Sequence, residues 1–253
     1  EGSFNFESAY LHRIETGGIG PNQASNILGL GTLFSFILTR ILTGRKKTFF
    51  QIIGITTLVQ TILTHSRGGF WNTIFSILVF YLFELTTSKS KVKLLGSALV
   101  IITTFYFILF PYLDDISGGS IVNRFSDNDL TSREVIIESE ILAYKKNPIF
   151  GIGPGESRKF RLEQFGNYQH SHTEFTRLIA EHGIFGLICL IILVLLVVSI
   201  IKNKKEFDRS ISLTLLSWSL LFMFHSGTRL AAPCLLFGFA FSKFSFNQMG
   251  EHK

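Results

Sequence analysis

A histidine and several arginines are the side chains in this sequence best suited to chemistry. His172 stands directly before an apolar helical pattern. An imidazole has an ordinary pKa near 6.5, which suits a general base. His170, two residues earlier, cannot be separated from His172 by sequence alone, and a solvated histidine at a helix entrance is the alternative. Arg67 precedes Gly68 and Gly69, which leave room for a ligand at its guanidinium; the alternative is an interfacial arginine that reaches lipid phosphate.

Further arginines share the same predicted side of the chain. A guanidinium stays charged and binds phosphate through two parallel hydrogen bonds. Each arginine alone is compatible with a surface charge, but together they suit a diphosphate held at a membrane surface. With Arg67 the set comprises Arg124, Arg133, Arg158, Arg161 and Arg229.

Other polar patterns favour structural roles. Glu174, Arg177 and Glu181 are spaced for a ladder of ion pairs on one helix face, with ligand binding by Arg177 as the alternative. Asp127 and Asp129 resemble a metal-binding Asp-x-Asp pair, yet they precede a helix start and read better as turn and cap residues. The Gly151–Gly155 run lacks the Lys-Ser/Thr of a phosphate loop and predicts a tight turn. We therefore predict no metal and no cofactor.

Composition indicates which scaffold positions these groups. The 253 residues are 47% apolar and 17% charged, with 27 Phe, and mean hydropathy is +0.36. Soluble domains carry about 25% charged residues. The net charge of +6 comes from basic residues scattered between apolar runs, which argues against nucleic-acid binding. The sequence therefore predicts an all-α, polytopic transmembrane helix bundle. Because it starts at Glu1, we expect a piece of a longer protein or a processed one.

About seven stretches approach the roughly 20 apolar residues needed to span a bilayer. They are 20–42, 48–65, 69–88, 93–112, 183–201, 210–226 and 229–246. Alternate linkers are rich in Lys and Arg, such as Arg45-Lys46-Lys47 and Lys202–Lys205, and these are predicted to be cytoplasmic. This orientation places the N-terminus, residues 113–171 and the turn at His225–Arg229 outside. His225 and Arg229 are candidates for closing an outer cavity.

The outer segment 113–171 is the one predicted connection long enough to fold. Thr131 or Ser132 can cap a helix that should end before Pro148, with an apolar stripe of Val135, Ile136, Ile137, Ile141 and Leu142. The sequence therefore divides into three parts. Residues 1–112 hold an extracytoplasmic N-terminal segment and four spans, and residues 113–171 form the loop with its amphipathic helix. Residues 172–253 hold three spans and a cytoplasmic tail. Cys189 and Cys234 lie in apolar runs and are predicted to be small core residues.

Four short stretches resemble the O-antigen ligase and polymerase superfamily of bacterial envelope glycosyltransferases. Their order and their side of the membrane match the C-terminal portion of that family. They are Gly20-Pro21-Asn22, Ser66–Gly69, Asn147–Gly155, and His172-Thr173 followed after nine residues by Gly183–Gly186.

The resemblance implies a metal-independent glycosyl transfer at the periplasmic face of the bacterial inner membrane. The donor would be a glycan on undecaprenyl diphosphate, and the acceptor a hydroxyl of lipid A–core or of another glycan. His172 would be the base, while Arg67 and Arg133 would stabilise the departing diphosphate. Substrate-binding candidates are Arg124, Arg158, Arg177, Arg229 and His170. Expected partners are these substrates and membrane lipids.

Three alternatives stay open. A polymerase or a protein O-oligosaccharyltransferase of the same superfamily would use the same chemistry on another acceptor. A transporter or flippase for lipid-linked sugars would also have many spans and an arginine-lined site. Transport is disfavoured because the sequence has no inverted repeat and no charge deep within a span.

Overall fold

Every regular secondary-structure element in the residues that the computed structural model describes is a helix, which confirms the all-α prediction. It describes residues 21–64, 66–84, 131–166, 171, 173–204, 206–225 and 230–242, with the single positions 96, 107, 111, 112 and 115. The expected N-terminal outer segment and nearly all of the expected 93–112 span lie outside these residues. The chain forms two compact units, and each is described by itself.

The first unit contains α2 (Pro21–Ile41), α3 (Gly44–Leu63) and α4 (Arg67–Glu84), together with the first half of α12 (Glu206–Phe222). Helix α2 packs against both α3 and α4. Phe36 of α2 meets Phe80 and Tyr81 of α4, each with ring centroids 5.3 Å apart. The three helices coincide with the first three spans expected from sequence.

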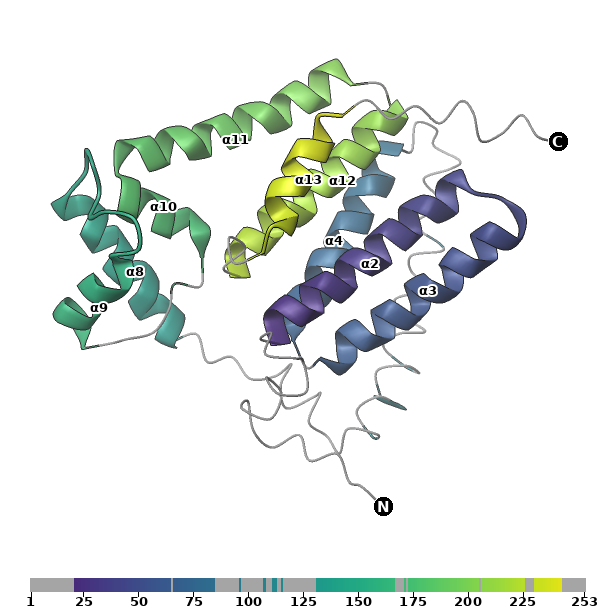
Figure 1. Ribbon diagram of the computed structural model, residues 1–253, viewed down its shortest axis with the longest axis horizontal. Coiled ribbons are helices and arrows are strands. Elements are labelled where there is room, and N and C mark those ends of the chain that lie inside the picture. Colours follow the sequence, from purple (N-terminus) through teal and green to yellow (C-terminus); the bar gives the residue numbers. More distant parts are fainter. Residues whose placement is uncertain are drawn as a thin grey trace. The chain divides into compact units, whose positions relative to one another are not determined.

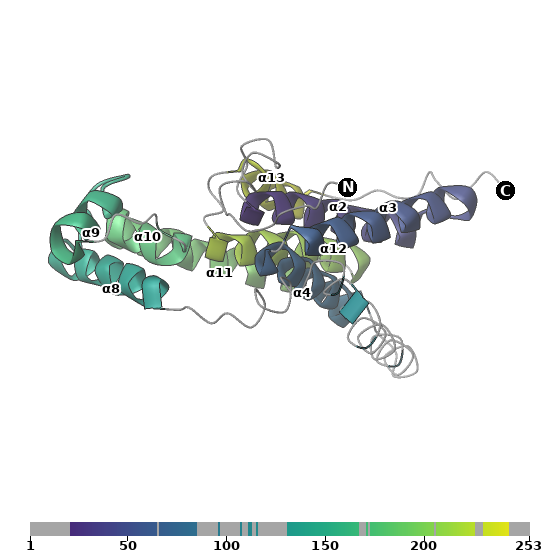
Figure 2. The same cartoon turned by 90° about the horizontal axis from the view of Figure 1, so that it is seen from below.

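The second unit contains α8 (Thr131–Lys146), α9 (Ser157–Phe165), α10 (Glu174–His182) and α11 (Ile184–Asn203). It also holds the second half of α12, the 3₁₀ turn η2 (Met223–His225) and α13 (Ala232–Ala240). Helices α8, α9 and α10 lie side by side in both ribbon views (Figures 1 and 2). The helix expected to begin at Thr131 or Ser132 and to end before Pro148 is confirmed as α8.

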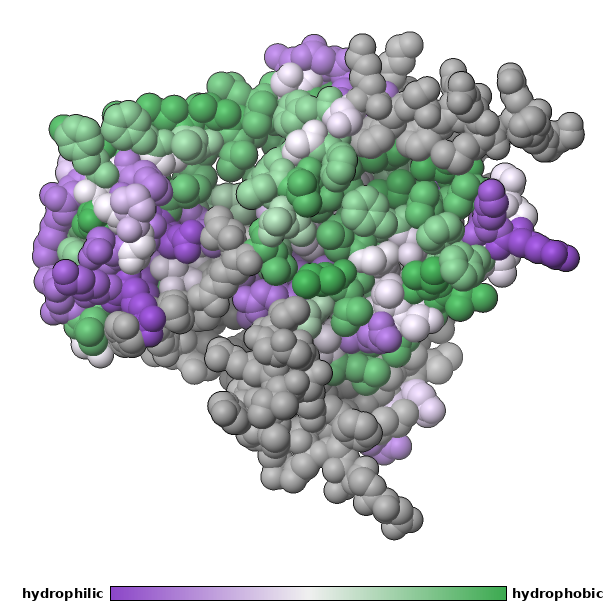
Figure 3. All heavy atoms as spheres, viewed as in Figure 1, coloured by the Kyte–Doolittle hydropathy of each residue, from purple (hydrophilic) through white to green (hydrophobic). Residues whose placement is uncertain are grey.

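Helix α11 has the surface of a helix that faces lipid. Its apolar side chains are exposed on several sides, Ile188, Ile191 and Val194 among them, and Figure 3 shows apolar surface along it. By length and composition, α11 and residues Asn22–Ile41 of α2 can cross a membrane, while Gly68–Glu84 is a shorter apolar helix. Cys189 is exposed on α11, and Cys234 is exposed on α13. The prediction that they are core residues is wrong, because apolar positions are exposed to the surface on both α11 and α13.

Helix α13 is shorter than the span expected at 229–246. It has nine residues and ends at Ala240, and nine helical residues rise only about 14 Å. A bilayer core is roughly 30 Å thick, so this helix alone does not cross it.

The buried face of α8 differs from the expected apolar stripe. Ile136 and Ala143 are buried as expected for a packed face, but they share it with Ser139 and Glu140. Ile137 and Ile141, by contrast, are each 38% exposed. The predicted stripe is wrong in part, because a buried ion pair rather than apolar periodicity sets the orientation of the helix.

Candidate functional site

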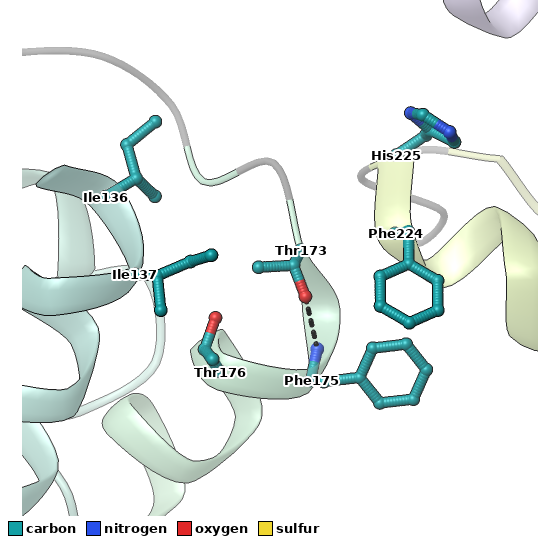
Figure 4. A pocket seen from close by; sticks show the side chains of 7 residues that line it. All are labelled: Ile136, Ile137, Thr173, Phe175, Thr176, Phe224 and His225. Carbon is teal, nitrogen blue, oxygen red and sulfur yellow. Dashed lines mark hydrogen bonds between the residues drawn. The ribbon is translucent and has the colours of Figure 1, made fainter. Parts of the chain in front are cut away.

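A cavity of about 560 Å³ opens in the second unit between α8, the start of α10 and η2. Its walls are largely apolar, and the polar groups come from two hydroxyls and an imidazole (Figure 4). This volume falls within the roughly 300–1,000 Å³ range of small-molecule sites. The lining residues are Ile136, Ile137, Thr173, Phe175, Thr176, Phe224 and His225.

Thr173 shapes the start of α10 at this cavity. It has extended backbone angles, and its hydroxyl accepts a hydrogen bond from the amide of Phe175 at 3.3 Å. That bond satisfies one of the free N–H groups at the helix start. The Phe175 ring lies 4.7 Å from that of Phe224 in η2, and Figure 4 shows the two rings beside Thr173. His172 immediately precedes Thr173 in the sequence and lies outside the described residues.

A buried ion pair lies behind the cavity wall. Arg161 Nη2 of α9 is 2.8 Å from Glu140 Oε1 of α8, and the two side chains are 0% and 1% exposed. Arg161 Nε donates to Ser139 Oγ at 2.8 Å, and Nη2 donates to Ser171 Oγ at 3.3 Å. The Thr176 hydroxyl donates to Glu140 Oε2. One network therefore joins α8, α9 and both ends of the 171–176 segment.

Burial dominates the electrostatics of this pair. It raises the pKa of the Glu140 carboxyl, although hydrogen bonds from Ser171 and Thr176 and the charge of Arg161 act to lower it. Burial also lowers the pKa of the Arg161 guanidinium, against the stabilising charge of Glu140. Both shifts share one cause, since removing a charge from water disfavours its ionised form.

The Gly-rich turn after α8 docks onto the end of α10. The amides of Ile152 and Gly153 donate to the carbonyls of Ala180 and Glu181, at 3.0 and 3.1 Å. In return, the amide of Ile184 donates to the carbonyl of Ile149 at 3.2 Å. Two of the four resembling stretches, 147–155 and 183–186, are thus in direct contact, and the turn expected at Gly151–Gly155 is confirmed.

Glycine is required at this contact by space as well as by conformation. Gly183 has φ +59°, and a Cβ there would lie 2.5 Å from the Ile149 carbonyl oxygen. Gly151 has φ +71°, and its Cβ would lie 2.4 Å from the Glu181 carbonyl. A side chain at either position would force the turn away from α10.

The other two resembling stretches meet in the first unit. Ser66 Oγ donates to Asn22 Oδ1 at 2.7 Å, and Ser25 Oγ donates to the Ser66 carbonyl at 3.1 Å. One turn further, Asn72 Nδ2 donates to Asn26 Oδ1 at 2.6 Å between buried side chains. These bonds fix the start of α4, where Arg67 is the first helical residue.

The structure describes only some of the arginine and histidine candidates. Arg177 pairs with Glu174, and its Nε lies 3.9 Å from Glu181 Oε2, which confirms the predicted ladder. Arg158 is half-buried on α9. Arg124, His170, His172 and Arg229 lie outside the described residues, as do the side chains of Arg67 and Arg133.

Arg161 corrects one expectation about the basic cluster. The sequence groups it with arginines expected on the outer face, but in the structure it is fully buried against Glu140. Glu140 itself was missed. Glu140 lies four residues after Ile136 and three before Ala143, and it shares their buried face of α8. A carboxylate on a buried face requires a cationic partner.

One family model matches this chain, that of the O-antigen ligase family, over residues 52–191, more than half of the sequence. The matched region runs from within α3 to within α11 and includes Arg67, Arg133, Glu140, Arg161 and His172. No curated protein and no solved structure matches the chain. On the extent of the family match, the chain belongs to the O-antigen ligase family, whose members are integral membrane proteins.

Proposed function

We propose that this protein is a membrane glycosyltransferase that moves a glycan from an undecaprenyl-diphosphate carrier to a sugar hydroxyl. The observation that carries the proposal is the family match across residues 52–191, which contain the proposed base and two of the proposed diphosphate ligands. Transfer takes place at the periplasmic face of the bacterial inner membrane, without a metal ion. In its native membrane the bundle crosses the bilayer several times with the N-terminus outside, although α13 by itself is too short for the seventh span expected at 229–246.

His172 takes the proton of the acceptor hydroxyl as that oxygen attacks the anomeric carbon. The bond between this carbon and the diphosphate oxygen breaks, and the carrier diphosphate leaves with the bonding electrons. Arg67 and Arg133 stabilise the charge that develops on it. The remaining phosphate and sugar oxygens are bound by Arg124, Arg158, Arg177, Arg229 and His170.

The cavity beside Thr173 supports this assignment. It adjoins the residue after His172, and its polar lining of Thr173, Thr176 and His225 can orient hydroxyl groups. Its apolar walls, among them Ile136 and Ile137 of α8, exclude water that would otherwise hydrolyse the donor. His225 comes from η2 and was already a candidate for closing an outer cavity.

The acceptor distinguishes the possible members of this superfamily. A ligase uses lipid A–core, a polymerase uses another repeat unit, and a protein O-oligosaccharyltransferase uses a side-chain hydroxyl. The experiment is mass spectrometry of envelope glycans after deletion of the gene. Long chains that stay on the carrier indicate a ligase, whereas unpolymerised single repeats indicate a polymerase.

An assay on the purified protein distinguishes an enzyme from a transporter for lipid-linked sugars. The protein is reconstituted with lipid-linked donor and acceptor in detergent, where no membrane separates two compartments. Glycan transfer under these conditions requires an enzyme. Absence of transfer with every acceptor class, combined with donor translocation in vesicles, would replace the proposal by transport.

A further inference from the structure

The buried ion pair of Glu140 and Arg161 contacts both ends of the segment that carries His172 in the sequence. Arg161 Nη2 donates to Ser171 Oγ, one residue before His172. Glu140 Oε2 accepts from the hydroxyl of Thr176, four residues after it. Ser171 also hydrogen-bonds to Glu140. The pair therefore binds Ser171 and Thr176, which lie on either side of His172 in the sequence.

The network is also continuous with the cavity wall. Thr176 lines the cavity and donates to Glu140, so the ion pair lies directly behind one wall. On the α8 side, Ser139 accepts from Arg161 Nε and donates to the carbonyl of Ile136, another lining residue. A change in the pair is thus transmitted to the wall through single hydrogen bonds.

We propose that Glu140 and Arg161 are positioning residues that hold the 171–176 segment against α8 and so set the place of the catalytic base. The inference rests on the proposed function in taking His172 as that base. Neither residue needs to touch the substrate. Both are almost completely buried, which fits a role exerted through Ser171 and Thr176.

A purely structural role makes a different prediction. Well-packed apolar side chains can often replace a buried ion pair without loss of stability, whereas removal of one partner leaves a buried charge uncompensated. If the pair serves stability alone, a variant with both partners apolar should fold and function normally. If it positions the segment, this variant should fold but transfer poorly, because Ser171 and Thr176 lose their charged partners.

The experiment compares Glu140→Met/Arg161→Met with the wild type in detergent, using lipid-linked donor and a glycan acceptor. We expect a thermal midpoint close to that of the wild type and a kcat lower by about 10–100-fold, since small displacements of a reacting group cost this much. The KM for donor should change much less. The control is Glu156→Met/Lys159→Met, a surface pair 3.9 Å apart in the same unit, which should keep wild-type kcat.

A second variant covers the case in which the apolar pair does not fold. Ser171→Ala/Thr176→Val leaves Glu140 and Arg161 in place and removes the two hydroxyls that connect them to the segment. We expect the same loss of kcat. Wild-type kcat in both double variants, or in this one if the other does not fold, would overturn the inference while the glycosyltransferase assignment stands.

Amide hydrogen exchange supplies a measurement that does not depend on activity. Peptides covering residues 171–176 should exchange faster in either double variant than in the wild type, while peptides from α11 should not change. Unchanged exchange at 171–176 would overturn the positioning role. If the wild type itself transfers no glycan, the proposed function fails, and the exchange result still decides whether the pair holds the segment.

Discussion

The guanidinium of Arg161 donates to the carboxylate of Glu140 over 2.8 Å, with neither side chain more than 1% exposed. The two residues lie on α9 and α8; Arg161 Nη2 also donates to Ser171 Oγ, and Glu140 Oε2 accepts from Thr176 Oγ1. This contact, rather than an apolar stripe, sets which face of α8 is buried. It also connects α8 and α9 to the start of α10 beside the cavity.

Arg161→Met should destabilise the protein by about 3–5 kcal/mol at neutral pH, because it leaves the buried Glu140 without its ion-pair partner. Loss of the guanidinium removes an attraction that lowers the Glu140 pKa, so this pKa rises further above its ordinary 4.5. A carboxyl whose pKa is higher in the folded than in the unfolded state stabilises the fold most at pH values below 4.5. This contribution is lost as the pH rises through the folded-state pKa.

The loss in free energy of unfolding caused by Arg161→Met should therefore be small at acidic pH and should increase toward neutral pH. Thermal unfolding in detergent, followed by the fluorescence of Trp218, which is buried in α12, measures it. Glu140→Met/Arg161→Met is the control, since it lacks the titrating carboxyl. A deficit that does not change with pH would contradict the account.

Gly183→Ala should release the Gly-rich turn from α10. The new Cβ would lie 2.5 Å from the Ile149 carbonyl oxygen, in addition to the strain of φ +59°. Gly166→Ala is the matched control, because Gly166 has φ +62° and nothing within 4 Å of a Cβ. The control should cost about 1–2 kcal/mol from conformation alone, and Gly183→Ala clearly more. Equal thermal midpoints would show that the contact contributes nothing.

Gly69→Ala should force α4 away from α2. A Cβ at this position would lie 2.2 Å from Ser25 Oγ and 2.3 Å from the Ser25 backbone. The control is Gly31→Ala in α2, whose nearest neighbour would be Thr57 Cγ2 at 3.5 Å, an ordinary contact. We expect a lower thermal midpoint and weaker transfer for Gly69→Ala, because the start of α4 carries Arg67. The control should match or exceed the wild type, since Ala favours helix over Gly by about 1 kcal/mol. Similar behaviour of the two variants would contradict the tight α2–α4 contact.

Asn26 and Asn72 should show a measurable coupling energy. Their side chains are hydrogen-bonded at 2.6 Å and almost fully buried between α2 and α4. A double-mutant cycle with Asn26→Ala and Asn72→Ala should give a coupling energy of about 0.6 kcal/mol and at most about 1.7 kcal/mol, the average and the maximum for hydrogen bonds between membrane helices. Strictly additive effects on unfolding would mean that this bond does not hold the helices in register.

Local rules predicted part of this structure from the sequence. Pro148 and the polar residues at 131–132 predicted the bounds of α8, and the spacing of Glu174, Arg177 and Glu181 predicted their ion pairs. Charge-free apolar length predicted α11. Each of these follows from neighbours within one helix.

Contacts between distant residues could not be predicted in this way. Glu140 and Arg161 are 21 positions apart in sequence, and no periodicity relates two separate helices. Apolar residues spread around α8, so its buried face could not be assigned without its partner helices. The docking of Gly151 onto Glu181 likewise depends on a chain reversal that composition does not encode.

The most direct test of the account compares two histidine variants of the purified protein with lipid-linked donor and acceptor. His172→Ala should abolish glycan transfer because the base is lost, while His182→Ala, at the last residue of α10, should retain it. Arg67→Ala should also be inactive, with Arg45→Ala, in the first turn of α3, as its control. All four should insert in the membrane at wild-type levels. Wild-type transfer by His172→Ala would contradict the central claim that this imidazole is the catalytic base.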